Sequence, residues 1–279
     1  MSRPWRRGLS AIRPCGCPGH RRVGHPPRLW AGWVVLAVAV TGCAGAGTSG
    51  GPGQPSSEIV VLAAASLTEA FTQIAADFEA AHPGTDVTLG FGGSSTLGPQ
   101  IVAGAPADVF AAASPDTMRL VVEAGAVSGA PAVFARNRLQ IAVPAGNPAD
   151  VGGLADLADP DLLVALCAPE VPCGAAAETA LAAAGVQARP DTLEQDVRAV
   201  LTKIELGEVD AGLVYRTDVL AAGAAVEGVR LPVAHDTVSD YLIAALADAD
   251  DPDLAVAFVD CVSSDQGQET LADAGFERP

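Results

Sequence analysis

Residues 59–70 read Ile-Val-Val-Leu-Ala-Ala-Ala-Ser-Leu-Thr-Glu-Ala, and this stretch decides the fold. Its first part, 59–63, is a short apolar run of the kind that forms a buried strand. A helix follows, because apolar residues recur at three- and four-residue spacing over 67–78. Ser66 followed by Glu69 is a capping-box pattern, which predicts that the Ser66 side chain caps this helix. A strand that passes directly into a helix indicates an α/β fold.

The same alternation continues to the C-terminus. Candidate strands lie at 59–63, 87–91, 109–112, 139–143, 162–166, 212–215, 229–233 and 241–245. Three further helices are predicted to begin after the Gly-Gly-Ser-Ser-Thr run at 92–96, near Pro172 and at Asp196. Gly185 and Gly207 are expected to end the last two. The pattern predicts an α/β fold with mainly parallel sheets.

The N-terminal segment is different in composition. Residues 1–28 contain seven arginines and no acid, and the apolar run 29–40 follows. This order is typical of a secretory signal, and a run of about 12 residues is short for a membrane span. The ending Val-Thr-Gly-Cys43 resembles a bacterial lipobox, which implies a signal peptide over 1–42 and a lipid on the Cys43 sulfur. An N-terminal membrane helix followed by an ordinary cysteine is the alternative.

Residues 43–57 are rich in Gly, Ser and Pro and are predicted to form a flexible tether behind the lipidated cysteine. Removal of 1–42 would leave 237 of the 279 residues, with nine basic and 33 acidic side chains and a formal charge of −24. Nucleic acid is excluded as a partner, because its phosphates need a basic counter-surface. A site for an anion in such a body has to be built from neutral dipoles.

Three of the six cysteines remain after Cys15, Cys17 and Cys43 are set aside. Cys167 and Cys173 are the nearest pair, and thiols outside the cytoplasm tend to pair. Both a bridge and two separate thiols stay open for this pair. Cys261 lies in an apolar pattern and is expected to be a buried thiol.

Candidate anion ligands gather at the predicted helix starts, where unpaired amides and a partial positive charge are exposed. They are the hydroxyls of Ser66, Ser94 and Tyr215 and the backbone amides of Cys173 and Val197. The three hydroxyl residues each have a purely structural alternative. Ser66 could be a helix cap, Ser94 could be a turn residue after the two glycines, and Tyr215 could be a core tyrosine. Asp196 is expected to cap its helix, because a carboxylate would repel an anion.

Other chemistries have less support. The four histidines are scattered, and no group of residues has metal-ligand spacing. The serine elbow of hydrolases and the lysine of a phosphate-binding loop are both absent. A secreted serine hydrolase using Ser66 or Ser94 would need His82 or His235 as its base, and no motif surrounds either histidine. A purely structural surface lipoprotein is the third class of function considered, and the clustering of motifs at helix starts argues against it.

Six motifs occur in order, at 61–70, 91–97, 101–111, 169–174, 196–198 and 212–215. Together they resemble the molybdate-binding periplasmic protein family of bacterial ABC transporters, over essentially all of 58–279. The resemblance implies a type II periplasmic-binding-protein fold, with two α/β lobes, two crossing segments and a ligand cleft between the lobes. Lobe 1 would comprise 58–136 plus 239–279, and lobe 2 would comprise 137–238.

The resemblance also implies a function. The chain would be an extracytoplasmic, membrane-anchored monomer that captures molybdate or tungstate and delivers it to an ABC permease, with no enzymatic activity and no cofactor. Carried over by position, Ser66 and Ser94 of lobe 1 and Cys173, Val197 and Tyr215 of lobe 2 would hold the oxyanion. They would contact oxygen, so molybdenum itself would have no protein ligand. Sulfate stays open as an alternative, because selection depends on cavity size.

Two departures from the family are visible. Cys173 stands where members often have alanine, which matters only if its thiol faces the ion. Gly92 and Gly93 replace positions where members can carry serine or alanine, and they could loosen the approach to Ser94.

Overall fold

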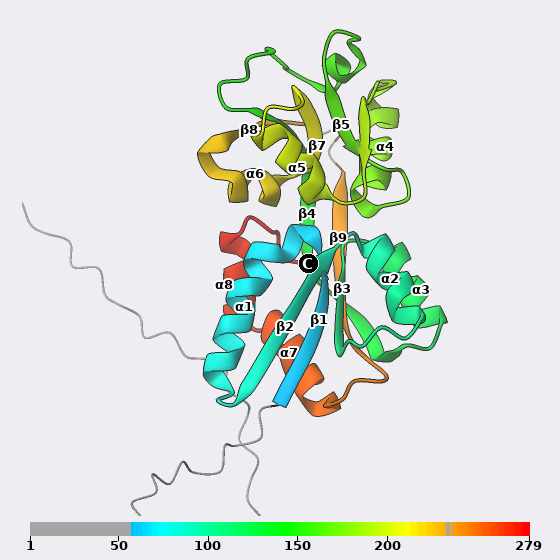
Figure 1. The fold of residues 1–279 in the computed structure, drawn as a ribbon, viewed down its shortest axis with the longest axis vertical. Coiled ribbons are helices and arrows are strands. Elements are labelled where there is room, and N and C mark those ends of the chain that lie inside the picture. Colours follow the sequence, from blue (N-terminus) through cyan, green and yellow to red (C-terminus); the bar gives the residue numbers. More distant parts are fainter. Residues whose placement is uncertain (1–56, 233–234, 236) are drawn as a thin grey trace, which may run out of the picture.

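The computed structural model describes residues 57–232, 235 and 237–279. The predicted signal peptide, the lipidation site Cys43 and the tether up to residue 56 therefore lie outside the described residues. Within the described part, no helix combines the length and the apolar character that a membrane span requires. Figure 1 shows two α/β lobes arranged along the long axis and joined through strands β4 and β9.

Lobe 1 is built from the first third of the chain and the C-terminal helices. Its elements are β1 (Ser57–Ala64), the 3-10 helix η1 (Ala65–Leu67), α1 (Thr68–Ala81), β2 (Thr85–Gly92), α2 (Ser94–Val102), β3 (Val109–Ala112), α3 (Pro115–Glu123), α7 (Pro252–Ser263) and α8 (Asp265–Asp273). The two crossing strands are β4 (Val127–Pro144) and β9 (Val238–Leu246).

Lobe 2 lies between the two crossing strands in the sequence. Its elements are η2 (Leu154–Ala158), β5 (Val164–Cys167), α4 (Pro172–Ala184), β6 (Thr192–Glu194), α5 (Val197–Glu205), β7 (Ala211–Tyr215), α6 (Arg216–Ala222), η3 (Gly223–Ala225) and β8 (Val226–Arg230).

The strands form one sheet that passes through both lobes, in the order β2-β1-β3-β9-β4-β7-β5-β6, with β8 also paired to β4. β4 pairs with β9 over 127–138 and then with β7 and β8 over 139–144. The prediction of mainly parallel sheets is wrong, because every pairing of β4 and β9 is antiparallel. Only β1 with β2 and β3, and β5 with β6 and β7, are parallel. Parallel neighbouring strands need a crossover connection, usually a helix. β4 and β9 instead carry the chain from one lobe to the other and back, so they run in opposite directions.

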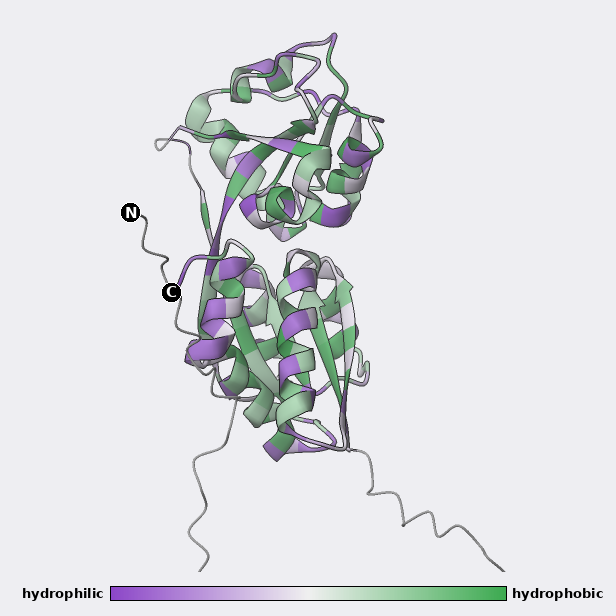
Figure 2. Ribbon diagram, turned by 90° about the vertical axis from the view of Figure 1, so that its left-hand side faces the viewer, coloured by the Kyte–Doolittle hydropathy of each residue, from purple (hydrophilic) through white to green (hydrophobic). Residues whose placement is uncertain are grey.

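Each lobe has its own apolar core, which explains why the two lobes are separate bodies. In lobe 1, clusters around Phe71 and Phe110 cover the two faces of the sheet. Lobe 2 has one cluster around Ile141, and Ala65 from lobe 1 belongs to it. Figure 2 shows the apolar strands inside each lobe and the polar residues on the outer helix faces.

The predicted starts of α4 and α5 are confirmed, whereas α2 begins at Ser94, inside the Gly-Gly-Ser-Ser-Thr run and not after it. Gly185 and Gly207 both have a φ of 67°, the left-handed conformation that ends a helix readily at glycine. Asp196 caps α5, since its carboxylate accepts the amide hydrogen of Ala199 at 3.0 Å.

The capping box at the first helix is wrong. Ser66 lies inside η1, one residue before the cap position of α1, and no side chain caps that helix. The short 3-10 turn moves the start of α1 to Thr68, so the Ser66 hydroxyl is free to contact Tyr241 instead.

Some strand predictions were incomplete. The candidates at 162–166 and 229–233 are found at 164–167 and 226–230, and residue 233 lies outside the described part. Strand β6 and the first half of β4, at 127–138, were not predicted. The missed half of β4 contains Gly, Pro and two arginines, so it shows no apolar run.

Cys167 and Cys173 form a disulfide between the end of β5 and the first turn of α4, with their Cα atoms 5.8 Å apart. Cys261 is buried in α7 and takes part in no disulfide among the described residues. The bridge closes the short loop that leads into α4, so it restricts that loop in the unfolded chain.

We predict that replacing both bridged cysteines, Cys167→Ser with Cys173→Ser, lowers the free energy of unfolding by about 2 kcal/mol, because a short loop loses its cross-link. Urea unfolding followed by circular dichroism measures the change. Reducing agent is the matched control: it should bring the wild type to the midpoint of the double variant and leave the variant unchanged. Equal midpoints of oxidised wild type and variant would contradict the prediction.

Candidate functional site

A small pocket lies where helix starts from the two lobes face each other. Its volume is about 20 Å³, against about 580 Å³ for a groove beside β4. It is lined by Ala64, Ala65, Ser66, Gly92, Gly93, Ser94, Ala113, Val171, Pro172, Cys173, Asp196, Val197 and Tyr215. The five residues predicted to hold an oxyanion all line this one pocket, although they are spread over 150 positions of the sequence.

Lobe 1 contributes two buried serines. Ser66 lies in η1 directly after β1, and Ser94 is the first residue of α2, directly after β2 and Gly93. Both are almost fully buried, at 4% and 1% exposed. The Ser94 oxygen accepts the amide hydrogen of Ala113 at 3.0 Å, so the hydroxyl hydrogen of Ser94 is left to donate elsewhere.

Lobe 2 contributes two helix starts. Cys173 lies in the first turn of α4 and Val197 is the first residue of α5, and no side chain caps α4. The first amides of a helix have no partner within it, so the amide hydrogens of both residues are available to a ligand. The sulfur of Cys173 is committed to its disulfide. A cysteine at 173, where family members often have alanine, therefore leaves the backbone amide of this residue available to a ligand.

Tyr215 ends β7 and presents the one aromatic hydroxyl in the pocket. This oxygen is buried and has no hydrogen-bond partner among the described residues. Burial raises the pKa of Tyr215 to about 12. The nearby hydroxyls of Ser239 and Tyr241 lower this pKa in part. Neither hydroxyl forms a hydrogen bond with the Tyr215 oxygen. The tyrosine therefore keeps its proton at neutral pH and is an unsatisfied donor, which is costly unless a ligand accepts from it.

The pocket contains no basic side chain. Arg198 is one residue beyond Val197, and its guanidinium pairs with Glu69 of α1 at 3.1 Å. This ion pair connects lobe 2 to lobe 1. Behind it, burial raises the pKa of Asp218 to about 7, with Arg198 opposing the rise. Another guanidinium nitrogen of Arg198 is buried without a hydrogen-bond partner among the described residues. The lining itself offers dipoles and no cation.

The arrangement is suited to binding and lacks the parts for catalysis. No histidine lines the pocket, and His82 packs at the end of α1 against Phe78. A serine nucleophile would need a base within hydrogen-bond reach. Among the described residues no cluster of His, Cys, Asp or Glu could hold a metal ion. What remains is a set of neutral donors that converge on a small volume.

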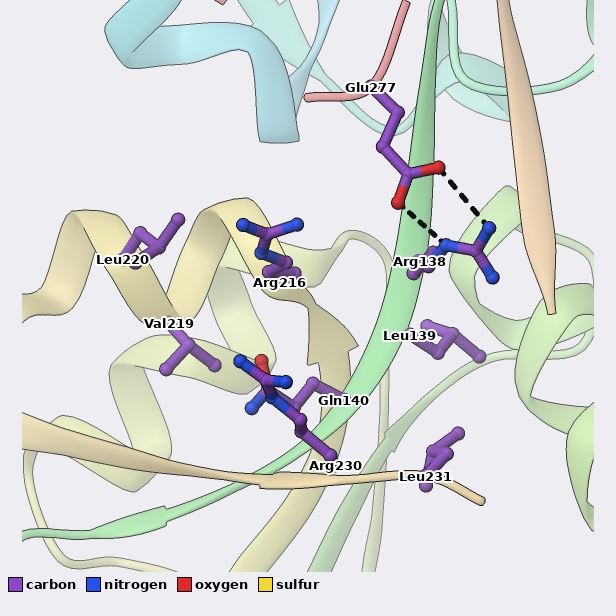
Figure 3. A pocket seen from close by; sticks show the side chains of 9 residues that line it. All are labelled: Arg138, Leu139, Gln140, Arg216, Val219, Leu220, Arg230, Leu231 and Glu277. Carbon is purple, nitrogen blue, oxygen red and sulfur yellow. Dashed lines mark hydrogen bonds and ion pairs between the residues drawn. The ribbon is translucent and has the colours of Figure 1, made fainter. Parts of the chain in front are cut away.

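A larger groove of the molecule is chemically different (Figure 3). It lies beside β4 and contains Arg138, Arg216 and Arg230, with Arg138 bound to Glu277 through two hydrogen bonds of 2.7 and 3.2 Å. Arg216 and Arg230 are exposed, so solvent and salt screen their charges. The groove is open and much larger than an inorganic anion, and it includes none of the predicted ligand residues.

Sequence reasoning missed the residues behind the pocket. Tyr241, Asn137 and Thr217 form a buried polar network that reaches the Ser66 hydroxyl. Asn137 gave a usable signal, because a small amide between two arginines in a strand that joins the lobes is an unusual residue to bury. Tyr241 gave none, since a tyrosine in an apolar strand is ordinary.

Comparison with known proteins agrees with this geometry. Residues 59–277 match the family model described as bacterial extracellular solute-binding protein. The molybdate-binding protein ModA of Mycobacterium tuberculosis is 42% identical over 252 residues, covering 88% of this chain and 97% of the relative.

Two solved structures show the same fold. The periplasmic molybdate-binding protein of Azotobacter vinelandii superposes with a TM-score of 0.69 at 20% identity, covering 79% of this chain and 99% of that one. The sulfate-binding protein SubI of M. tuberculosis superposes with a TM-score of 0.70 at 21% identity, covering 80% and 87%. The predicted type II periplasmic-binding-protein fold is therefore confirmed.

The family match and the ModA relative each cover most of the chain, and the family is one of transport proteins, so the expectation of no enzymatic activity is supported as well. The chain belongs to the bacterial extracellular solute-binding protein family, together with its ModA relatives.

Proposed function

We propose that this chain captures molybdate or tungstate outside the cytoplasm and delivers it to an ABC permease. The observation that carries the proposal is the pocket itself: three hydroxyls and two helix-start amides from both lobes line one small pocket without a basic side chain. An oxyanion with four acceptor oxygens and no proton matches such a set of donors. Helix N-termini supply the partial positive charge that compensates its two negative charges.

The ligand residues of the proposal are Ser66, Ser94 and Tyr215 through hydroxyls, and Cys173 and Val197 through amides. The unpartnered Tyr215 oxygen supports this assignment, because a ligand would satisfy it. The protein needs no resident cofactor for this function, and molybdenum would be held only through its oxygens. The identity to ModA favours molybdate over sulfate, while the structural likeness to SubI keeps sulfate as the second candidate.

Delivery requires a closed form that a permease can distinguish from an open one. Gly93 supports such a closure, because a Cβ atom there would lie 2.4 Å from the carbonyl oxygen of Gln195 in the opposite lobe. Gly92 has more room, with its nearest contact at 3.5 Å from a side chain of its own lobe. The glycine at 93 thus permits the backbones of the two lobes to approach closely.

The membrane attachment belongs to the same proposal. The basic segment, the apolar run and the Val-Thr-Gly-Cys43 sequence support export with cleavage before Cys43 and a lipid on that cysteine. The tether that follows would let a monomer reach a permease in the same membrane.

The experiment that tests the function is a thermal-shift screen of the purified chain without its signal peptide against molybdate, tungstate, sulfate, phosphate and chromate, followed by calorimetric competition. Molybdate and tungstate should raise the melting temperature in proportion to the logarithm of their concentration. Sulfate should displace molybdate only in large excess. If sulfate bound as tightly as molybdate, the ligand would be reassigned to sulfate. If no oxyanion raised the melting temperature, the proposal would be refuted.

Tyr215→Phe should separate binding from stability. The hydroxyl has no hydrogen-bond partner in the described part of the chain, so its removal should leave the unliganded melting temperature equal or higher. Loss of a hydrogen bond to a charged ligand should weaken molybdate binding by about 1–3 kcal/mol in calorimetry. Ser94→Ala should weaken binding by a similar amount but should also destabilise the fold, because the Ala113 amide loses its acceptor. Full affinity in both variants would remove these hydroxyls from the site.

Gly93→Ala should impair closure, because the added methyl would collide with backbone that is not free to rotate away. We expect a larger radius of gyration with saturating molybdate in small-angle X-ray scattering, and an affinity at least tenfold weaker. Gly92→Ala is the matched control and should behave as the wild type. A Gly93→Ala variant as compact as the control would show that the close approach is unimportant.

A further inference from the structure

A chain of buried polar groups lies directly behind the Ser66 side of the pocket. The Tyr241 hydroxyl is 2.8 Å from the Ser66 hydroxyl oxygen. The Asn137 side-chain nitrogen is 3.4 Å from the Tyr241 oxygen and 2.9 Å from the Thr217 oxygen. All four residues are buried, and only Ser66 lines the pocket. The chain crosses the molecule, from lobe 1 through both crossing strands to α6 of lobe 2.

The hydrogen bonds in this chain have one consistent direction. The backbone N–H of Arg138 donates to the Asn137 side-chain oxygen at 2.9 Å, which fixes the orientation of that amide. The Asn137 nitrogen then faces Tyr241 as a donor, so the Tyr241 oxygen accepts. The proton of Tyr241 is left to donate to Ser66, its remaining hydrogen-bond partner among the described residues.

Reversal of this direction would leave a buried proton unpaired. If Ser66 donated to Tyr241, the Tyr241 proton would have no acceptor in hydrogen-bond geometry among the described residues, since the neighbouring Tyr215 oxygen makes no hydrogen bond. An unpaired proton is costly in a dry interior. Burial also raises the pKa of Tyr241 well above its ordinary value, so the phenol keeps its proton. Ser66 is therefore an acceptor from Tyr241, and its own proton is left for the pocket.

We infer that Tyr241, held by Asn137, is a positioning residue that orients Ser66 as a donor and thereby disfavours any ligand with a protonated oxygen beside Ser66. The inference rests on the proposed oxyanion function and extends it to specificity. Molybdate and tungstate carry no proton at neutral pH, whereas phosphate keeps at least one. A phosphate hydroxyl beside Ser66 would point its hydrogen at the hydroxyl hydrogen of Ser66, so neither hydrogen would have an acceptor there.

Tyr241→Phe tests the inference, by calorimetric titration with molybdate and with inorganic phosphate competing against it. Without the phenol, Ser66 can rotate and can also point its oxygen at a ligand proton. We expect molybdate affinity to fall by about tenfold, as for the loss of one hydrogen bond, and phosphate affinity to stay equal or rise. The ratio of the two affinities is the decisive readout, since a general weakening of the fold would lower both.

Two further variants complete the design. Thr217→Val removes the other partner of Asn137 without touching the Tyr241–Ser66 bond, so it should lower the melting temperature and leave the affinity ratio unchanged. Asn137→Asp replaces the donor by a carboxylate, to which Tyr241 would donate. Ser66 would then donate to Tyr241, and molybdate affinity should fall further than in Tyr241→Phe. If Tyr241→Phe does not fold, the ratio of molybdate to phosphate affinity in Asn137→Asp tests the positioning role instead.

The outcomes separate the two proposals. Molybdate binding by the wild type with an unchanged affinity ratio in Tyr241→Phe overturns the positioning role and leaves the proposed function standing. A wild type that binds no oxyanion overturns both. A shifted ratio in Tyr241→Phe together with a wild-type ratio in Thr217→Val establishes the positioning role.

Discussion

The site depends on one constraint: a dianion has to leave water and enter a pocket where no side chain carries a compensating charge. Removal of an ion from water costs several kcal/mol, so every oxygen has to find a donor that is already oriented. The fold meets this requirement with helix starts, because the first amides of a helix are unpaired and aligned with its dipole. Cys173 and Val197 provide such amides from α4 and α5, opposite the two serines of lobe 1.

The architecture follows from the need to surround the ion from two sides. Each lobe has its own core and supplies part of the donors, so neither lobe alone forms the pocket. β4 and β9 hold the lobes in one sheet, and within the described part of the chain they are the strands that pass between the lobes. The same two strands carry Asn137 and Tyr241, so the groups that orient Ser66 lie in the strands that join the two lobes.

Apart from Asp196, whose carboxylate caps α5 at the pocket, the charged groups lie outside the pocket lining. The mature chain would be strongly acidic, yet surface charges are screened beyond about 8–10 Å in physiological salt. Near the site, Arg198 is occupied by Glu69, and the raised pKa of Asp218 leaves that buried acid only partly ionised at neutral pH. The ion pair joins the lobes, and the partly neutral acid limits the repulsion felt by an anion.

The sequence by itself determined the elements and the residue types of the site. Apolar periodicity located α1. Pro172 and Asp196 located the starts of α4 and α5, and Gly185 and Gly207 located their ends, because these are local effects of backbone geometry. The motif resemblance selected Ser66, Ser94, Cys173, Val197 and Tyr215, and these five line one pocket.

Only the tertiary structure decided how these parts act together. The antiparallel crossing strands, the contact of Gly93 with the opposite lobe and the chain from Asn137 through Tyr241 to Ser66 all join residues more than 50 positions apart. Such pairings depend on how two lobes pack, and no local propensity encodes them. Ser66 shows the difference: its neighbours in sequence predicted a helix cap, whereas its neighbour in space, Tyr241, gives its hydroxyl a direction.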